Sequence, residues 1–154
     1  MEVSLNRYEE KYDQSLKNFQ LPKEQEQFTA LPVEMLEINE ERHPIVIVSQ
    51  NKAVGFFVLH SSARVQEYTD NPKAMLLTAF SINQAEQGKG YAFQGMQQIK
   101  SFVQDEFPGF NEVVLAVNHK NIPAQKLYEK VGFKDTQRRK IGSIGEQFIL
   151  SLSL

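Results

Sequence analysis

Residues 87–92 read Gln87-Gly88-Lys89-Gly90-Tyr91-Ala92, and the segments on either side of this stretch give it a meaning. An apolar run, residues 74–82, comes before it. A strand that leads through a glycine turn into a helix points main-chain N–H groups at one place, where the helix dipole adds positive potential. The pattern therefore predicts a phosphate-binding turn. The helix is expected because four apolar residues after the turn fall on one face: Ala92, Met96, Ile99 and Val103.

A second signature follows at residues 121–133, which read Asn-Ile-Pro-Ala-Gln-Lys-Leu-Tyr-Glu-Lys-Val-Gly-Phe. Together the two stretches resemble the GNAT superfamily of acetyl-CoA-dependent N-acetyltransferases. The pyrophosphate loop of that family reads Gln/Arg-x-x-Gly-x-Gly/Ala, and Gln87, Gly90 and Ala92 match it. The resemblance is specific over residues 74–133 and weak before them. The later family pattern is matched by Asn121, Ala124, Leu127, Tyr128, Gly132 and Phe133.

The resemblance implies that acetyl-CoA is the co-substrate and that the main-chain amides of residues 87–92 bind its pyrophosphate. Small residues in the turn keep side-chain bulk away from these amides, and Lys89 could add charge on the solvent side. In the family, the pantetheine arm hydrogen-bonds to the backbone of the preceding strand, and an amide near Ile82 polarises the thioester carbonyl. The alternative to a phosphate-binding turn is a plain strand-to-helix turn, and the alternative to a pantetheine-binding strand is an ordinary buried strand. The cofactor-binding residues so implied are Phe80, Ser81, Ile82, Gln87, Gly88, Lys89, Gly90, Tyr91, Ala92 and Asn121.

Tyr128 is the catalytic residue that the resemblance implies. Acyl transfer expels a coenzyme A thiolate, and a positioned phenol can protonate it. Tyr128 also lies on the apolar stripe of its own helix, so a packing role with a satisfied hydroxyl is the alternative. Asn121 could contact the pantetheine or could simply cap the helix that follows it.

The sequence does not assign a general base. A primary amine with a pKa near 10.4 must lose a proton before it attacks, which costs about 4.6 kcal/mol at pH 7. Many members of the family use a Glu on the strand before the loop, or a chain of water molecules, but residues 74–80 contain no carboxylate. The three histidines lack metal-ligand spacing, so no metal is expected. The candidate bases, each of which could equally be a surface or structural residue, are His119, Glu40, Glu41 and His60.

Length and composition narrow the class of protein. A chain of 154 residues with 41% hydrophobic residues predicts one globular domain. It contains no cysteine, which excludes disulfides, thiolate metal sites and a cysteine acyl-enzyme. No window resembles a membrane span or a secretory signal, so we expect a cytoplasmic protein without a membrane partner. A net charge of −2 does not favour nucleic acid as a partner and slightly favours a cationic small molecule.

The element pattern predicts a mixed α/β fold of the α+β class. We expect a twisted, mostly antiparallel sheet of six to seven strands flanked by about four helices, with a parallel crossover around residues 91–106. Within the single domain 1–154, residues 1–70 would face the acceptor, residues 74–133 would form the acetyl-CoA-binding core, and residues 133–154 a C-terminal hairpin. The expected strands are 3–7, 45–49, 54–60, 74–83, 112–117, 133–139 and 146–152, and the expected helices are 8–19, 33–39, 91–106 and 124–131.

These expectations favour an N-acetyltransferase that passes acetyl directly to a primary amine. A small acceptor such as a polyamine is preferred, because the loop at residues 87–92 looks like that of polyamine acetyltransferases. A protein N-terminus or a lysine is the alternative acceptor. Two other classes stay open: a weakly catalytic acyl-CoA-binding regulator and a purely structural interaction domain. The run Phe148-Ile149-Leu150 could be an edge strand used for homodimerisation, or could be buried in the monomer.

Overall fold

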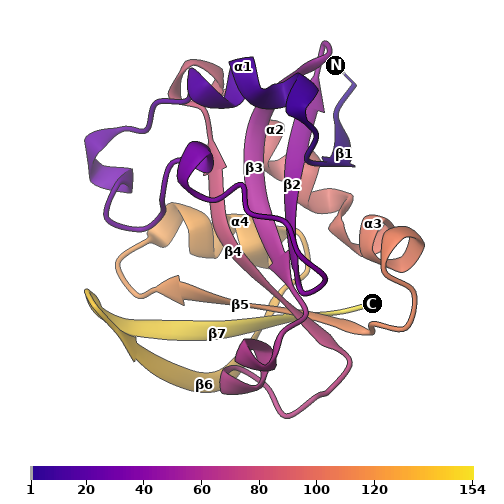
Figure 1. Ribbon diagram of the computed structural model, residues 1–154. Coiled ribbons are helices and arrows are strands. Elements are labelled where there is room, and N and C mark those ends of the chain that lie inside the picture. The colour runs from indigo at the N-terminus through magenta and orange to yellow at the C-terminus, as the bar shows by residue number, and fades with distance from the viewer. Residues whose placement is uncertain (1) are drawn as a thin grey trace.

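The computed structural model describes residues 2–154. Its centre is a seven-stranded sheet in the order β1-β2-β3-β4-β5-β7-β6 (Figure 1). Neighbouring strands are antiparallel except for β4 and β5, which run parallel. This arrangement confirms the mixed, mostly antiparallel sheet. The strands are β1 (Ser4–Arg7), β2 (Arg42–Ser49), β3 (Lys52–His60), β4 (Ala74–Ile82), β5 (Glu112–Asn118), β6 (Lys134–Gly142) and β7 (Gly145–Ser153).

Helices cover both faces of the sheet. In the view of Figure 1, α2 and α4 lie behind the sheet, and the N-terminal segment with α1 lies in front. Short 3₁₀ turns occupy the connections. The α-helices of the described residues are α1 (Asp13–Lys17), α2 (Tyr91–Gln97), α3 (Ile99–Glu106) and α4 (Ile122–Lys130), and the 3₁₀ turns are η1 (Glu10–Tyr12), η2 (Lys23–Gln25), η3 (Pro32–Glu34), η4 (Ala63–Glu67) and η5 (Gln84–Glu86).

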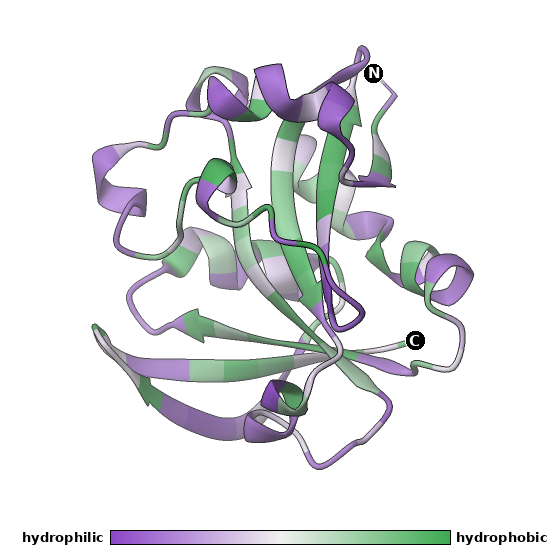
Figure 2. Cartoon of the chain, in the orientation of Figure 1, coloured by the Kyte–Doolittle hydropathy of each residue, from purple (hydrophilic) through white to green (hydrophobic). Residues whose placement is uncertain are grey.

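Side chains along the central strands point alternately to the two faces of the sheet and form two hydrophobic cores. Phe57 of β3 packs with the helices α2 and α3, whereas its neighbours Phe56 and Val58 pack under the N-terminal segment. Both faces of β2 and β3 are therefore largely apolar, and Figure 2 shows most of these two strands in green. Strands buried on both faces need such nearly continuous apolar runs. A further cluster, with Tyr68 and Val65, lies under η4.

Two of the expected helices are corrected by the structure. The helix predicted at 33–39 is wrong, because only the turn Pro32–Glu34 forms. The Arg42 guanidinium donates hydrogen bonds to the carbonyl oxygens of Met35, at 3.0 Å, and Glu37, at 3.1 Å. These oxygens therefore do not accept the hydrogen bonds of a helix. The helix predicted at 8–19 shrinks to η1 and α1, although Tyr12, Leu16 and Phe19 still pack on the sheet as expected.

The crossover helix is two helices rather than one. α2 ends at Gln97 and α3 begins at Ile99, with Gln98 between them. The Gln98 side chain donates a hydrogen bond of 2.6 Å to the carbonyl of Val3, which holds the junction against the chain before β1. α2 also lies close to the sheet, because a Cβ on Gly95 would come within 2.9 Å of Ile47. A larger side chain at Gly95 would overpack this contact.

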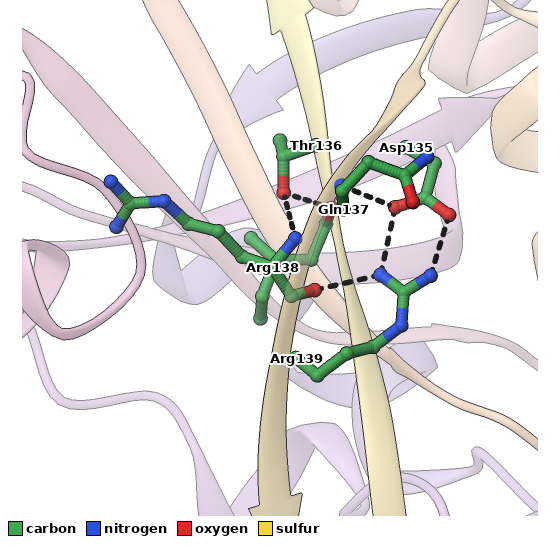
Figure 3. Close-up of polar contacts among 6 residues, drawn as sticks. Asp135, Thr136, Gln137, Arg138 and Arg139 are labelled. Atoms are coloured by element: carbon green, nitrogen blue, oxygen red, sulfur yellow. Dashed lines mark hydrogen bonds and ion pairs between the residues drawn. The ribbon is translucent and has the colours of Figure 1, made fainter.

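The C-terminal hairpin also differs from one expectation. β7 pairs with both β5 and β6, so Phe148–Leu150 is not an edge strand, and β6 takes the edge instead. β6 carries a bulge at Gln137, where φ is +71°. Figure 3 shows how the bulge is held: Arg139 donates two hydrogen bonds, each 2.8 Å, to the carboxylate of Asp135. A bulged, charged edge resists pairing with another strand.

Candidate active site

The strands β4 and β5 form a fork. Their parallel pairing runs from Ala74 with Glu112 to Leu77 with Leu115, and within residues 2–154 no later pair joins them. Ala79, with φ of +58°, lies in a bulge opposite Phe57 of β3, which bends β4 away from its neighbour. Such bulges re-aim a strand. The two strands therefore part, and the backbone of residues 78–82 loses a partner on one side.

A cavity of about 800 Å³ fills this fork. It extends from the turn before α2 to the start of α4 and to the N-terminal segment, so it joins the expected cofactor side to the expected acceptor side. The cavity is lined by Tyr128 and by every residue of the implied cofactor-binding set except Lys89. The residues that line the cavity include Glu24, Gln25, Thr29, Thr78, Phe80, Ser81, Ile82, Glu86, Gln87, Gly88, Gly90, Tyr91, Ala92, Asn121 and Tyr128.

The turn at the start of α2 has the backbone form that an anion site needs. Gly88 and Gly90 have φ values of +80° and +85°, in the left-handed region that glycine tolerates best. Gly90 is the N-cap of α2. Among residues 2–154, no acceptor is hydrogen-bonded to the amide N–H groups of Gly88, Lys89 and Gly90. A helix N-terminus with unsatisfied amides binds anionic groups well.

A charge cluster lies beside this turn. The buried carboxylate of Glu86 receives hydrogen bonds from Lys52 at 3.0 Å and from Lys89 at 3.1 Å. The Lys52 hydrogen bond above all lowers the pKa of Glu86, so the carboxylate stays ionised. Lys89 therefore pairs with Glu86 rather than projecting into the cavity, and the two lysines leave the cluster with one excess positive charge. Neither Glu86 nor Lys52 was predicted from the sequence.

Gln87 fastens the turn to the end of β4 and to the N-terminal segment. Its Nε2 donates to the carbonyl of Ile82 at 3.0 Å and to Oε1 of Gln25 at 3.1 Å. The first bond fixes the turn against the end of β4. The second bond ties it to η2 of the N-terminal segment, which lines the cavity. The Gln at the first position of the motif is thus a structural clamp in this chain.

Tyr128 lies on α4 with its ring buried and its hydroxyl unpaired. The ring packs edge-on against Phe80 and Phe133, with centroids 6.1 and 5.6 Å away. No hydrogen bond of the described residues includes this hydroxyl, whereas the packing alternative expects a satisfied one. Burial raises the pKa of Tyr128, so the phenol keeps its proton at neutral pH. A buried, protonated donor at a cavity wall can act as a general acid.

Asn121 and Ser81 also reach the cavity. Asn121 is the N-cap of α4, and its Oδ1 accepts a hydrogen bond of 3.4 Å from the amide of Ala124. The capping alternative is therefore realised, although the bond is long and the side chain still lines the cavity. Ser81 is 4% exposed, and its Oγ has no partner among the described residues. An unpaired buried hydroxyl is unfavourable unless a ligand satisfies it.

The structure separates the candidate bases. Glu40 and Glu41 are exposed in a turn, and neither they nor His119 line the cavity. His119 Nδ1 instead lies 2.9 Å from the Glu146 carbonyl. His60 is 5% exposed and contacts the cavity through another residue, since its Nε2 lies 2.7 Å from Oγ1 of Thr78. Thr78 was not predicted from the sequence, although it is the one hydroxyl residue within residues 74–80.

His60 is expected to make stability depend on pH. Burial, then nearby Arg64, Arg42 and His43, lower its pKa from 6.5 to about 4. Below pH 6.5 the unfolded chain therefore binds a proton that the folded chain refuses, and stability falls as pH falls. Between pH 7 and pH 5 we expect His60 to remove about 2 kcal/mol from the free energy of unfolding. Urea unfolding of wild type and His60→Gln, followed by circular dichroism at both pH values, measures this; equal losses in the two proteins would contradict it.

Unpaired carboxylates lie at the end of the cavity where we expect the acceptor, and in an adjoining cavity. Glu24 lines the main cavity, and Glu26 and Glu34 line an adjoining cavity of about 470 Å³. No salt bridge within residues 2–154 includes any of these three carboxylates. Thr29 lines both cavities. Unpaired carboxylates attract cationic ligands, although Lys120 also lines the main cavity.

The described residues hold no cluster of three or more His, Cys, Asp or Glu that could bind a metal ion. None of their helices combines the length and the apolar character that crossing a membrane requires. The candidate site therefore consists of main-chain donors, a buried phenol, buried hydroxyls and carboxylates.

Comparisons with known proteins agree with this geometry. A model of the acetyltransferase (GNAT) family matches residues 7–133. An uncharacterized N-acetyltransferase of Bacillus subtilis (strain 168), YbbJ, is 42% identical over 153 residues, which cover 97% of this chain and 96% of that protein.

Two solved structures have a similar fold. AAC(6′)-Ib in complex with paromomycin and acetyl-CoA has a TM-score of 0.76 at 17% identity, over 98% of this chain and 93% of that one. A chimera of the spermidine N-acetyltransferase SpeG from Vibrio cholerae and hSSAT has a TM-score of 0.72 at 15% identity, over 99% of this chain and 96% of that one. At these identities the two structures show likeness of fold alone.

Proposed function

The chain belongs to the acetyltransferase (GNAT) family, whose N-acetyltransferases use acetyl-CoA, and on this premise we propose that it passes acetyl directly to a primary amine of a small polycation such as a polyamine. The main-chain amides of residues 87–92 would hold the pyrophosphate, with Asn121 and the backbone of Phe80, Ser81 and Ile82 along the pantetheine. Tyr128 would protonate the departing thiolate. The observation that carries the proposal is the unpaired Tyr128 hydroxyl at the wall of the β4–β5 fork, beside a turn with unpaired amides.

A main-chain amide and the Tyr128 hydroxyl would have different roles in acetyl transfer. An amide near Ile82 would donate to the thioester oxygen as negative charge develops on it. The amine nitrogen bonds to the acyl carbon, the carbon–sulfur bond breaks, and the sulfur takes the proton of the Tyr128 hydroxyl. The phenolate then recovers a proton from solvent or from the amine. Direct transfer is favoured because the chain has no cysteine for a thioester relay.

The acceptor class follows from the charge of the cavity. Glu24 is unpaired at the expected acceptor side of the main cavity, and Glu26 and Glu34 are unpaired in the adjoining cavity, which suits an amine with more than one positive charge. The names of the two structural neighbours point the same way, since one acts on spermidine and the other was solved with paromomycin. A protein N-terminus or lysine is the second acceptor class.

The test is a panel of amines with wild-type protein and acetyl-CoA. The panel contains polyamines, an aminoglycoside, peptides with free N-termini and lysine peptides, and the readout is the release of coenzyme A thiol. We expect the highest kcat/KM with polyamines. Thiol release only with peptides would replace the acceptor class. Tight acetyl-CoA binding with no release for any amine would favour the regulatory alternative, and no coenzyme A affinity by calorimetry would favour a structural domain.

We propose a cytoplasmic enzyme without nucleic-acid or membrane partners, with residues 1–70 on the acceptor side, 74–133 as the cofactor core and 133–154 as the hairpin. A homodimer built through a sheet edge would have to use β1 or β6, since β7 is an interior strand.

A further inference from the structure

Thr78 and His60 form a buried pair at the point where the fork opens. Thr78 follows Leu77, the last residue of β4 that pairs with β5, and precedes the bulge at Ala79. Thr78 lines the cavity, and its Oγ1 lies 2.7 Å from Nε2 of His60 on the neighbouring strand β3. Two residues further along β4, Phe80 packs against the ring of Tyr128. Thr78 therefore lines the same cavity as the proposed acid Tyr128.

We propose that Thr78 is a hydrogen-bond acceptor for the attacking amine, and that His60, as a neutral ring, positions the Thr78 hydroxyl for this role. The inference rests on the proposed function and adds to it a residue that binds the reacting nitrogen. No proton is transferred to His60 in this scheme. Thr78 orients the amine, and the neutral amine arises by exchange with solvent.

The hydrogen-bonding capacity of a hydroxyl makes this possible. Oγ1 of Thr78 has two lone pairs and one proton. If Nε2 of His60 accepts, both lone pairs remain for the cavity; if Nε2 donates, one lone pair remains. In either tautomer the Thr78 oxygen can accept an N–H of the amine while His60 holds its direction.

The surroundings of His60 keep the ring neutral. The residue is 5% exposed, and the charged or titratable groups acting on it, Arg64, Arg42 and His43, all disfavour a positive ring. Its pKa of about 4 makes it a poor proton acceptor at neutral pH, which separates this role from the general-base role. A neutral ring also avoids repelling a cationic acceptor.

The test compares kinetic constants of four variants and the wild type with a polyamine. We expect Thr78→Val to raise the KM for the amine at least tenfold and to leave the KM for acetyl-CoA within twofold, because the hydrogen bond to the amine is lost. Thr78→Ser should restore most of the amine KM. His60→Gln should give an intermediate effect, because an amide can still hold the hydroxyl. The matched control is Ser61→Ala, since Ser61 pairs with His43 at 3.3 Å outside the cavity.

Three results would overturn the role. The first is an unchanged amine KM in Thr78→Val. The second is an equal rise in the KM for the amine and the KM for acetyl-CoA. The third is an inflection in the pH profile of wild-type kcat/KM that disappears in His60→Gln, which would make His60 a base. If Thr78→Val does not fold, ¹⁵N NMR of the His60 ring is the second test. The ring signal should shift when the amine is added to the complex with coenzyme A. An unchanged signal would contradict the role of Thr78. A wild type inactive on every amine removes the proposed function and this role with it, whereas an active wild type with an unaffected Thr78→Val removes this role alone.

Discussion

Replacing Tyr128 by Phe is expected to lower kcat roughly 100- to 1000-fold while acetyl-CoA binds with its normal affinity. The substitution removes one oxygen and leaves the ring, whose edge contacts with Phe80 and Phe133 involve no hydroxyl. Since no hydrogen bond of residues 2–154 includes that hydroxyl, its loss breaks no hydrogen bond of the fold. The effect should therefore appear in turnover and not in stability.

The control for Tyr128 is a second buried tyrosine. Tyr68 is 7% exposed, packs under η4 and does not line the cavity, so Tyr68→Phe should leave kcat unchanged. Stopped-flow detection of thiol release with both variants makes the comparison. Burial raises the pKa of Tyr128 above its usual value of 10, so wild-type turnover should not decline up to about pH 10 through loss of this proton. Normal turnover by Tyr128→Phe would exclude the acid role.

The parts of the site that could be predicted from the sequence depend on local chemistry. The turn at residues 87–92 needs glycine at positive φ, and Gly88 and Gly90 adopt such angles. The helix that carries Tyr128 begins at a capping Asn121 and ends before Gly132, which has φ of +111°. Such signals lie within a few residues of the structure they specify. They could therefore be recognised without knowledge of the rest of the chain.

The parts that could not be predicted depend on contacts between distant segments. The clamp between Gln87 and Gln25, and the pair formed by Thr78 and His60, each join residues on different elements. The sequence holds no local pattern for either. The helix expected at 33–39 failed for the same reason, because the competitor for its carbonyls, Arg42, belongs to β2.

The bulge at Ala79 shows how such a miss affects the site. Alanine rarely adopts a φ of +58°, and the apolar run at residues 74–82 reads as an uninterrupted strand. At the bulge the register of β4 with β3 shifts, just after the point where β4 leaves β5. The strained residue thus lies where the strand pairing changes, and it lines the cavity. Strain of this kind is commonly found at functional sites.

Gly90→Ala is expected to weaken acetyl-CoA binding at least tenfold, which makes it the strongest test of the proposed pyrophosphate turn. An L-residue at φ of +85° is strained by roughly 1–2 kcal/mol. The turn can relieve that strain only by rotating the peptide planes that carry its amides, and amides that point elsewhere no longer converge on a phosphate.

Gly109→Ala separates loss of binding from loss of stability. Gly109 has φ of +101°, and no neighbouring atom lies within 4 Å of the position that a Cβ would take there, so alanine carries a similar backbone cost away from the cavity. Both variants should lower the unfolding midpoint by comparable amounts, but calorimetric titration should show normal acetyl-CoA affinity for Gly109→Ala. Should Gly90→Ala also bind normally, the unpaired amides of the turn would not be the phosphate site, because a change in their direction would have had no effect on the ligand.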